Sequence, residues 1–466
     1  MKKLLRTQTG RFVAGLVALL ILVCAAGAAQ KLPLKADITP QKLMTMSEKS
    51  LDVVKELDEE IDLYYMATES GKELWVDELA QKYAEASGFI SYEMIDPSTA
   101  RAADIATMAG MSLAENSLVV ASGRRMYTIA PDSLYSTQYN QMYYYYYGEL
   151  VADAQYFVAD SELMNAILYV TRDDLPVVYA LTGHGEVTAA GQMLASIQKY
   201  NVVVEQMRLD GNAVPDDAAA VLIYGPSGDI TKSEADALLD YLKDGGNLIL
   251  LTDYMMGDLP NLEAVAEYYG MKQVEGIILD MTSGYSYSTD YPQYLMPDVS
   301  EHEVTSVLFN YNAKPIISYA SAMERGEVER EGLEVTTLLT TSDAAYMKNA
   351  AVAMSTALEE GDPVGKFAVA MAAEEGGTKF VWFTSASFLD DTDVNVSSGG
   401  NLFLLENMLE WMVPLVERET FMGDNLVLDA LKVPENIPAA AVYAALFVPA
   451  VIMLAVGMLR GRKKKA

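Results

Sequence analysis

The chain has 466 residues, and 51% of them are apolar, which predicts roughly two to three folded domains and excludes bulk disorder. The formal net charge is −32, although nine of the 33 basic residues sit at the two ends of the chain. The body between them keeps 24 basic against 65 acidic residues, a net charge of about −41. A body this acidic repels phosphate backbones and anionic lipid, so we expect no nucleic-acid partner and a body that stands away from the membrane surface.

Two uncharged segments, 12–29 and 439–459, predict transmembrane helices, because each is close to the roughly 20 residues that cross a hydrocarbon core. The tails outside them, 1–11 and 460–466, are basic. The positive-inside rule therefore puts both termini in the cytoplasm and the body outside the membrane. The first segment has an alternative interpretation as a cleaved signal peptide, since Ala26-Gly27-Ala28 forms a small-residue cleavage site.

The first part of the body, 37–131, predicts a small α/β domain. Its expected order is strand, helix, strand and then a β-hairpin, which suggests a thioredoxin-like arrangement. The expected strands are 61–66, 90–95, 118–121 and 126–129, and the expected helix is 74–86. No Cys-x-x-Cys motif is present, so disulfide exchange is excluded. Residues 132–174 follow as a tyrosine-rich connector, for which a loop or an irregular edge strand is favoured over a contact surface.

The second domain, 175–422, predicts a Rossmann-like or amidotransferase-like parallel sheet, because apolar strands alternate with helices. Thr231 and Glu234 form a capping-box pattern before one of these helices, and 281–297 is expected to be an irregular loop. The expected strands are 177–181, 202–206, 220–224, 248–251, 335–341, 367–372 and 380–384, and further helices are 191–199 and 401–412. A linker, 423–438, leads to the second membrane segment.

One loop is a candidate ligand or contact site. Gly183, His184, Gly185 and Glu186 follow the first strand of the second domain, where open α/β sheets bind ligands. A dinucleotide loop would need a glycine where Thr188 stands, Glu186 would repel phosphate, and no Walker-type loop exists, so we expect no cofactor. The alternative interpretation, which we favour, is a turn in which His184 bonds to its own loop.

The residue inventory predicts a protein without catalytic or metal-binding residues. An amidotransferase-type hydrolase needs a nucleophilic cysteine on the sheet, but the only cysteine, Cys24, lies in the first membrane segment. A serine triad needs a histidine, and neither His184 nor His302 is near a G-x-S-x-G motif. A zinc site built on histidine and cysteine is excluded by the same inventory.

A cluster of acidic residues follows the strand predicted at 380–384. Asp390, Asp391, Asp393 and Asn395 resemble the start of a calcium loop, but the glycine and glutamate of an EF-hand are missing. Paired carboxylates would also suit glycoside hydrolysis. We favour a solvated acidic loop.

Several segments occur in a characteristic order along the chain: Asp37 to Leu43 with Met46-Ser47, Leu181 to Glu186, Asp244 to Leu248, His302 to Thr305, Leu338 to Ser342, and Phe380 to Leu389 with Asn401 and Trp411. In this order they resemble the GldG-like family of gliding-motility and ABC-transport auxiliary proteins. The resemblance implies a thioredoxin-like domain, then an amidotransferase-like domain without catalytic residues. It also implies work beside an ABC permease and a cytoplasmic ATP-binding subunit. The tyrosine-rich stretches depart from the family pattern.

The sequence thus predicts a non-catalytic, membrane-anchored extracytoplasmic auxiliary subunit of an ABC-type transport system, acting by contact with the permease. Two alternatives stay open. One is an extracytoplasmic carbohydrate-active hydrolase that uses Asp390 or Asp391. The other is a stand-alone binding or scaffold protein.

Overall fold

The computed structural model describes residues 43–139, 143, 151–255, 257–349, 355–421 and 426. Both predicted membrane segments, 12–29 and 439–459, lie outside these residues. Within them, no helix is both long enough and apolar enough to cross a membrane. The chain divides into two units, and the larger one comprises Met44–Leu134 and Val158–Phe421. The described part of the smaller unit contains an antiparallel hairpin of β5 (Tyr135–Tyr139) and β6 (Ala152–Phe157).

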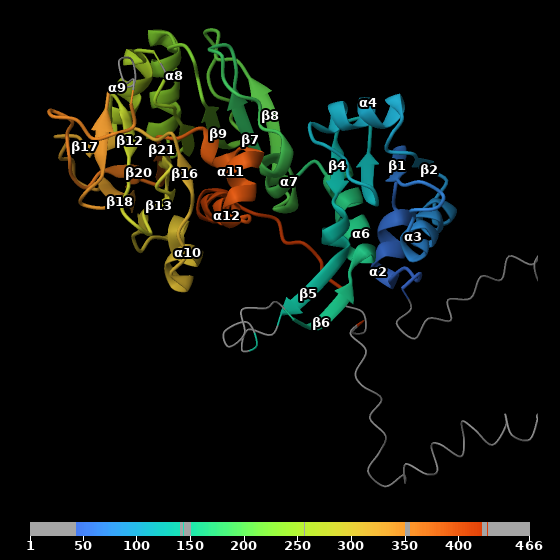
Figure 1. Cartoon of the computed structure of the whole chain (residues 1–466). Helices are drawn as coiled ribbons and strands as arrows, with labels where there is room; N and C mark the ends of the chain where they lie inside the picture. The colour runs from blue at the N-terminus through green and yellow to red at the C-terminus, as the bar shows by residue number, and fades with distance from the viewer. Residues whose placement is uncertain are drawn as a thin grey trace, which may run out of the picture. The chain divides into compact units, whose positions relative to one another are not determined.

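The first sheet of the larger unit has four strands in the order β2-β1-β3-β4 (Figure 1). Strands β1 and β2 are parallel, and β3 and β4 are each antiparallel to the preceding strand in that order. The strands are β1 (Ile61–Met66), β2 (Ile90–Ile95), β3 (Ser117–Ala121) and β4 (Met126–Ile129), and the helices are α2 (Glu48–Lys55), α3 (Leu74–Ala86) and α4 (Ala100–Ala109). The predicted strands and the helix at 74–86 are confirmed within one residue, whereas α4 was not predicted. The sequence features that mark the ends of α4 are Thr99, the N-cap residue, and Gly110, which has a left-handed conformation at the C-terminal end.

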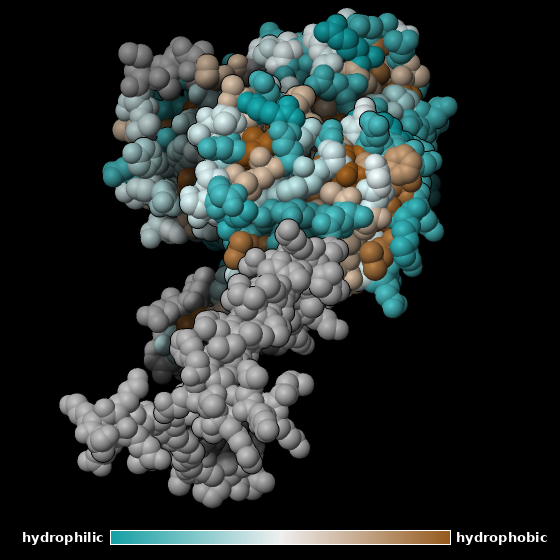
Figure 2. Space-filling view, turned by 90° about the vertical axis from the view of Figure 1, so that its right-hand side faces the viewer, coloured by the Kyte–Doolittle hydropathy of each residue, from teal (hydrophilic) through white to brown (hydrophobic). Residues whose placement is uncertain are grey.

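The surface of this part is mixed in polarity. Figure 2 shows the side of the molecule on which α3, β2 and α4 lie, and there apolar residues occur at a few places among hydrophilic ones. Leu74, Trp75, Phe89 and Met108 are the large exposed apolar residues that the structure describes in Met44–Leu134. Single exposed apolar side chains are normal on soluble surfaces, so this face defines no site.

The segment expected as a connector, 132–174, contains regular structure. Besides β5 and β6 it holds the short 3-10 helix η2 (Pro131–Leu134) and helix α6 (Ala159–Thr171). Helix α6 packs on β3 and β4, and nine of its 13 residues are buried. A helix buried on most sides has no polar face, so periodicity could not reveal it.

The main sheet has the strand order β11-β17-β20-β21-β10-β9-β7-β8. The five strands from β21 to β8 are parallel, and β20, β17 and β11 continue the sheet in antiparallel pairs. The α/β class is therefore confirmed, with an antiparallel extension that was not foreseen. The strands are β7 (Val177–Leu181), β8 (Val203–Met207), β9 (Ala218–Tyr224), β10 (Leu248–Leu251), β11 (Met271–Val274), β17 (Ala322–Arg325), β20 (Ala368–Glu375) and β21 (Thr378–Phe383); β15 (Asp298–Val299) pairs with β18 (Glu334–Thr340), which also pairs with β20.

Helices cover both faces of this sheet (Figure 1). In β10, Ile249 and Leu251 belong to one core, whereas Leu248 and Leu250 belong to the other. Successive side chains of a strand point to opposite faces, so four buried residues in a row require two covered faces. One core includes α7 (Gly191–Lys199) and α12 (Gly400–Met412), and the other includes α8 (Lys232–Lys243) and α9 (Pro260–Tyr268). The predicted capping box of Thr231 and Glu234 is present at the start of α8.

The prediction of an irregular loop at 281–297 is wrong. The segment contains β13 (Ser286–Ser288) and β14 (Tyr291–Leu295), which form a three-stranded sheet with β16 (Ile317–Ser318). Proline, serine and glycine in and around these short strands concealed their alternation. The remaining elements are β12 (Ile277–Leu279), β19 (Tyr346–Lys348), α10 (Ser306–Tyr311), α11 (Asp391–Val396) and the 3-10 helices η3 (Glu303–Thr305) and η4 (Ser387–Leu389).

Candidate functional site

The parallel strands run in the order β8-β7-β9-β10-β21, which is 2-1-3-4-5 in chain order. In such a doubly wound sheet, ligands bind at the carboxyl ends of the strands, near the point where the strand order reverses. That point lies between β7 and β9. The loop predicted from the sequence, Gly183 to Glu186, follows β7 and therefore lies at the expected edge.

In this loop, His184 is held between two glutamates. Its Nδ1 lies 3.1 Å from Glu186 Oε1, and its Nε2 lies 3.1 Å from Glu234 Oε2. Glu186 also accepts the backbone N–H of His184 at 2.8 Å. Burial raises the pKa of Glu234, but hydrogen bonds from Thr231 and the contact with His184 outweigh it and leave the pKa below its usual value. Both ring nitrogens of His184 thus have hydrogen-bond partners, Glu186 in the loop and Glu234 in α8. This supports the interpretation of the loop as a turn held by His184.

The loops after β7 and β9 close directly over the switch point. The backbone N–H groups of Ser227 and Gly228 donate to the His184 carbonyl at 3.0 and 2.8 Å. Gly185 has φ +79°, and a Cβ there would lie 2.0 Å from Ser227 Oγ. Glycine adopts this conformation at the lowest cost, and any larger residue would have to displace the Ser227 hydroxyl. Hydrogen bonds therefore join the two loops across the crevice between β7 and β9.

Two cavities open beside this closed crevice. The first, here called the tyrosine cavity, has a volume of about 350 Å³ and lies over the carboxyl ends of β9, β10 and β21. Its walls include Ser227, Asp253, Tyr254, Met255 and Tyr319. The rings of Tyr254 and Tyr319 are stacked, with centroids 5.9 Å apart and an angle of 17°.

Tyr319 reaches the cavity in an uncommon backbone conformation. It follows β16 and has φ +54°, a value that few residues other than glycine adopt. Its backbone N–H donates to the Gln293 carbonyl at 3.1 Å, and its ring meets the edge of Tyr294 at 5.7 Å. Strained backbone of this kind occurs at functional sites, where the surrounding structure holds it.

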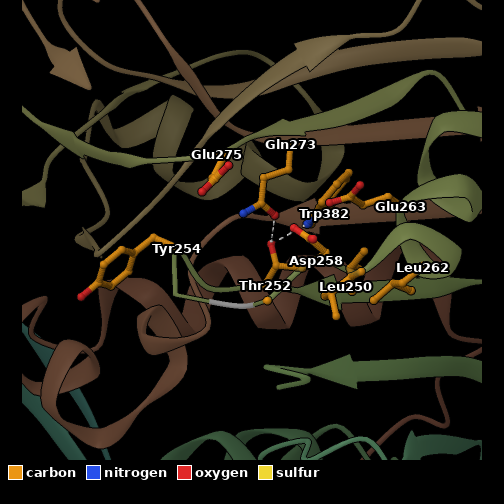
Figure 3. A pocket seen from close by; sticks show the side chains of 11 residues that line it. Leu250, Thr252, Tyr254, Asp258, Leu262, Glu263, Gln273, Glu275 and Trp382 are labelled. Carbon is orange, nitrogen blue, oxygen red and sulfur yellow. Dashed lines mark hydrogen bonds between the residues drawn. The ribbon is translucent and has the colours of Figure 1, made fainter. Parts of the chain in front are cut away.

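The second cavity, here called the acidic cavity, has a volume of about 380 Å³ and lies between β10, α9 and β11 (Figure 3). At its floor, Trp382 Nε1 donates to Thr252 Oγ1 and Thr252 Oγ1 donates to Gln273 Oε1, each at 2.8 Å. Three exposed carboxylates line it, those of Asp258, Glu263 and Glu275. Tyr254 lines both cavities, and Figure 3 shows its ring turned away from the Thr252–Gln273 pair.

Both cavities have a negative electrostatic environment. Although Glu263 is exposed, partial desolvation in the cavity raises its pKa, and the neighbouring carboxylates of Glu267, Asp258 and Asp229 raise the pKa further, against the opposing charge of Lys272. Burial also raises the pKa of Tyr254, with Asp253 and Tyr319 adding to the shift. The described residues that line the two cavities include no lysine or arginine. The edge is therefore suited to neutral or cationic groups.

The acidic cluster predicted after β21 forms a helix start. Asp390 Oδ1 accepts the N–H of Asp393 at 2.8 Å and caps α11, and Asp391 Oδ1 accepts the N–H of Gln192 at 2.9 Å. Asn395 Oδ1 accepts from the Gln192 side chain at 3.2 Å. Asp393 is only 2% exposed and accepts from the Ser318 hydroxyl, and burial raises its pKa to about 6. The interpretation as a solvated loop is thus wrong for Asp393.

No metal site appears in the part of the chain that the structure describes, where no group of three or more His, Cys, Asp or Glu residues could hold an ion. His302, the other histidine, lies against Trp411 with ring centroids 5.0 Å apart, and its Nδ1 accepts the N–H of Val304. Burial lowers its pKa. His302 therefore packs and caps the 3-10 helix η3.

The cavity residues were missed in the sequence. Thr252, Asp253 and Tyr254 directly follow β10, so the rule that located Gly183–Glu186 would also have located them. Tyr319 follows a two-residue strand, and Gln273 lies on β11, for which no sequence pattern was found. Those two residues reach the edge only through tertiary structure.

Comparison with known proteins gives one family. Residues 175–378 match the family model ABC_transp_aux, described as "ABC-type uncharacterized transport system". The match covers less than half of the chain and contains the His184 loop, Tyr254 and Tyr319. It supports the resemblance to ABC-transport auxiliary proteins and does not distinguish a GldG-like member. A search of curated proteins gave no match.

Solved structures give distant likenesses only. The "mmIFT52 N-terminal domain" is 13% identical with a TM-score of 0.37, and the match covers 51% of this chain and 96% of that one. PurLQS from Thermotoga maritima is 10% identical with a TM-score of 0.28, with 51% and 99% covered. Exo-beta-1,4-mannosidase Op5Man5 from Opitutaceae bacterium strain TAV5 is 10% identical with a TM-score of 0.28, with 74% and 49% covered. Likenesses this weak carry no functional argument.

Proposed function

We propose that this chain is a non-catalytic, membrane-anchored auxiliary subunit of an ABC-type transport system, with its body outside the cell membrane. The observation that carries the proposal is the family match over residues 175–378, which includes most of the main sheet. We further infer that the sheet β2-β1-β3-β4 is thioredoxin-like, because a parallel β-α-β unit is followed by a hairpin. The order 2-1-3-4-5 of its parallel strands supports the inference that the main sheet belongs to the amidotransferase-like domain that the GldG-like resemblance implies.

Contacts between the start and the end of the larger unit support the membrane arrangement. Lys49 Nζ lies 2.8 Å from Glu419 Oε2 and 5.7 Å from the centre of the Phe421 ring. Lys49 follows the first predicted membrane segment, and Phe421 precedes the second. The first helix and the last residues of the larger unit therefore lie close together. This geometry suits a body held by two neighbouring helices that cross the same membrane.

The segment 413–421, here called the C-terminal strap, ties that place to both sheets. Asn165, on α6, donates to the Glu419 carbonyl at 2.7 Å and accepts the Glu419 N–H at 3.2 Å. Asn201, which precedes β8, donates to the Val416 carbonyl at 3.1 Å. Arg418 donates to the Glu162 carboxylate at 2.8 Å. Force on the second predicted span would thus reach both sheets through hydrogen bonds of the strap.

A non-catalytic role is consistent with the hydrogen bonds that the candidate acidic and histidine side chains make within the fold. Asp390 and Asp391, the carboxylates considered for glycoside hydrolysis, each accept a backbone N–H through Oδ1. His184 is bonded on both ring nitrogens. No observation therefore favours the hydrolase alternative over the auxiliary role.

Purification from native membranes tests this proposal. The tagged full-length chain, extracted in a mild detergent, should carry with it a multi-spanning ABC permease and an ATP-binding subunit, identified by mass spectrometry. The untagged chain is the control. Recovery of the chain without any transporter component would contradict the proposal and favour the stand-alone scaffold alternative.

A further inference from the structure

The tyrosine cavity combines two features that recognise positive charge. Its walls contain the stacked rings of Tyr254 and Tyr319, and a phenol ring carries negative charge on its face. An organic cation over such a ring is attracted by that charge, most strongly where water is excluded. The volume, about 350 Å³, falls within the range of small-molecule sites, about 300 to 1,000 Å³.

Carboxylates supply the second feature. Asp253 lines the cavity, and its Oδ1 accepts the N–H of Met255 at 2.9 Å, which fixes the carboxylate at the wall. Burial raises the pKa of the Tyr254 phenol, and the charge of Asp253 adds to the shift. The charge beside this ring is therefore negative.

The arrangement disfavours anionic ligands. A phosphate or carboxylate ligand would meet Asp253 without a lysine or arginine among the described residues that line the cavity. The exposed Met255, 73% accessible, and the ring carbons provide apolar contact for alkyl groups. A compact cation with apolar substituents satisfies both kinds of wall.

We propose that the tyrosine cavity binds a small alkylammonium compound, whose charged head contacts the rings of Tyr254 and Tyr319 and the carboxylate of Asp253. The site lies at the carboxyl edge of the sheet, beside the closed switch point, where loops after β9, β10, β16 and β21 meet. This inference does not depend on the proposed function, because it concerns the cavity alone and its test does not use a transporter.

Choline chloride is a suitable probe, and its uncharged isostere, 3,3-dimethylbutan-1-ol, is the control ligand. The full-length protein is placed in nanodiscs of phosphatidylglycerol, so that no lipid carries a choline group. Each ligand is titrated at constant ionic strength, and binding is followed by saturation-transfer NMR and by calorimetry. We expect choline to bind about tenfold more tightly than the alcohol, the ratio that a combined cation–π and charge interaction provides.

Variants separate the two features of the wall. Tyr319→Leu and Tyr254→Leu should each weaken choline binding about fivefold or more, whereas Tyr319→Phe should retain it because the ring face is kept. Asp253→Asn should weaken binding while preserving the acceptor for Met255 N–H. Tyr291→Leu is the matched control, because this exposed tyrosine of β14 does not line the cavity.

Two results would overturn the inference. One is equal affinity for choline and the alcohol. The other is choline affinity that survives Tyr319→Leu but is lost in Glu263→Gln, which would place the site in the acidic cavity. Thermal unfolding of every variant verifies that the fold is intact, and Tyr319→Phe and Asp253→Asn keep the test valid if a leucine variant fails to fold.

Discussion

Arg418 and Glu162 are joined by a hydrogen-bonded ion pair of 2.8 Å although they lie 256 positions apart in the sequence. Arg418 also donates to the Tyr127 hydroxyl at 2.7 Å and to the Lys199 carbonyl at 3.2 Å. One side chain of the C-terminal strap thus contacts β4, α6 and the end of α7. The side chains of Arg418 and Glu162 are 15% and 18% exposed, so the pair is largely shielded from water.

We expect Arg418→Met to lower the free energy of unfolding by about 3 kcal/mol, because Glu162 would keep a shielded charge without its partner. The double variant with Glu162→Leu should recover part of that loss. Lys49→Met is the control: Lys49 and Glu419 are 60% and 53% exposed, and such surface pairs contribute about 0 to 1 kcal/mol. Urea unfolding measures all three. Equal losses for Arg418→Met and Lys49→Met would contradict this account of the strap.

The raised pKa of Asp393 predicts a pH-dependent stability. Its folded-state pKa is about 6, above the unfolded value near 3.9, so the folded protein binds this proton more tightly than the unfolded one. Asp393 therefore destabilises the fold as pH rises through roughly 4 to 6. We therefore compare the free energy of unfolding of Asp393→Asn with that of the wild type. The variant's advantage should be about 2 kcal/mol larger at pH 7.5 than at pH 4.5. A stability difference that is constant between these pH values would show that Asp393 titrates normally.

Gly185 and Gly183 provide a matched pair for the loop after β7. Gly183 has φ +126°, and a Cβ added there would meet nothing within 4 Å, whereas Gly185 has φ +79° and its Cβ would lie 2.0 Å from Ser227 Oγ. Gly183→Ala and Gly185→Ala should each cost about 1 to 3 kcal/mol through backbone strain, because neither φ suits a side chain. Ser227→Ala should lower the cost of Gly185→Ala, because it removes the hydroxyl that the new Cβ would displace, and should leave the cost of Gly183→Ala unchanged. An equal effect of Ser227→Ala on both costs, measured by thermal unfolding, would show that the two loops do not approach as closely as described.

The sequence predicted elements well where local signals agreed with packing. Strand β10 was located without error, because four buried apolar residues, Leu248–Leu251, follow the helix stop Gly245-Gly246. Helix α8 was located by the capping box of Thr231 and Glu234. In these segments, periodicity, caps and burial point to the same structure.

The elements that were missed lack such agreement. Helix α6 is buried on most sides, and β13 and β14 are short and carry serine, tyrosine and proline. In the candidate site, too, some residues were predicted from local sequence signals and others are brought in only by tertiary contacts. The edge of the sheet was predicted from Gly183 to Glu186, but the tyrosine cavity needs Tyr319, which a two-residue strand brings to Tyr254 across 65 positions of sequence. Contacts between distant segments leave no periodic signal in the sequence.

The orientation of the body tests the account most directly. In a Cys24→Ser background, single cysteines replace Met255, which is 73% exposed, or Ala466, the last residue of the basic tail. A membrane-impermeant maleimide is then applied to cells whose outer layers are permeabilised and whose cell membrane is intact. The account predicts labelling of Met255→Cys in intact cells and labelling of Ala466→Cys only after the cell membrane is lysed. The opposite result would be labelling of Ala466→Cys before lysis and of Met255→Cys only after lysis. That result would contradict the proposal that the body of this auxiliary subunit is extracytoplasmic.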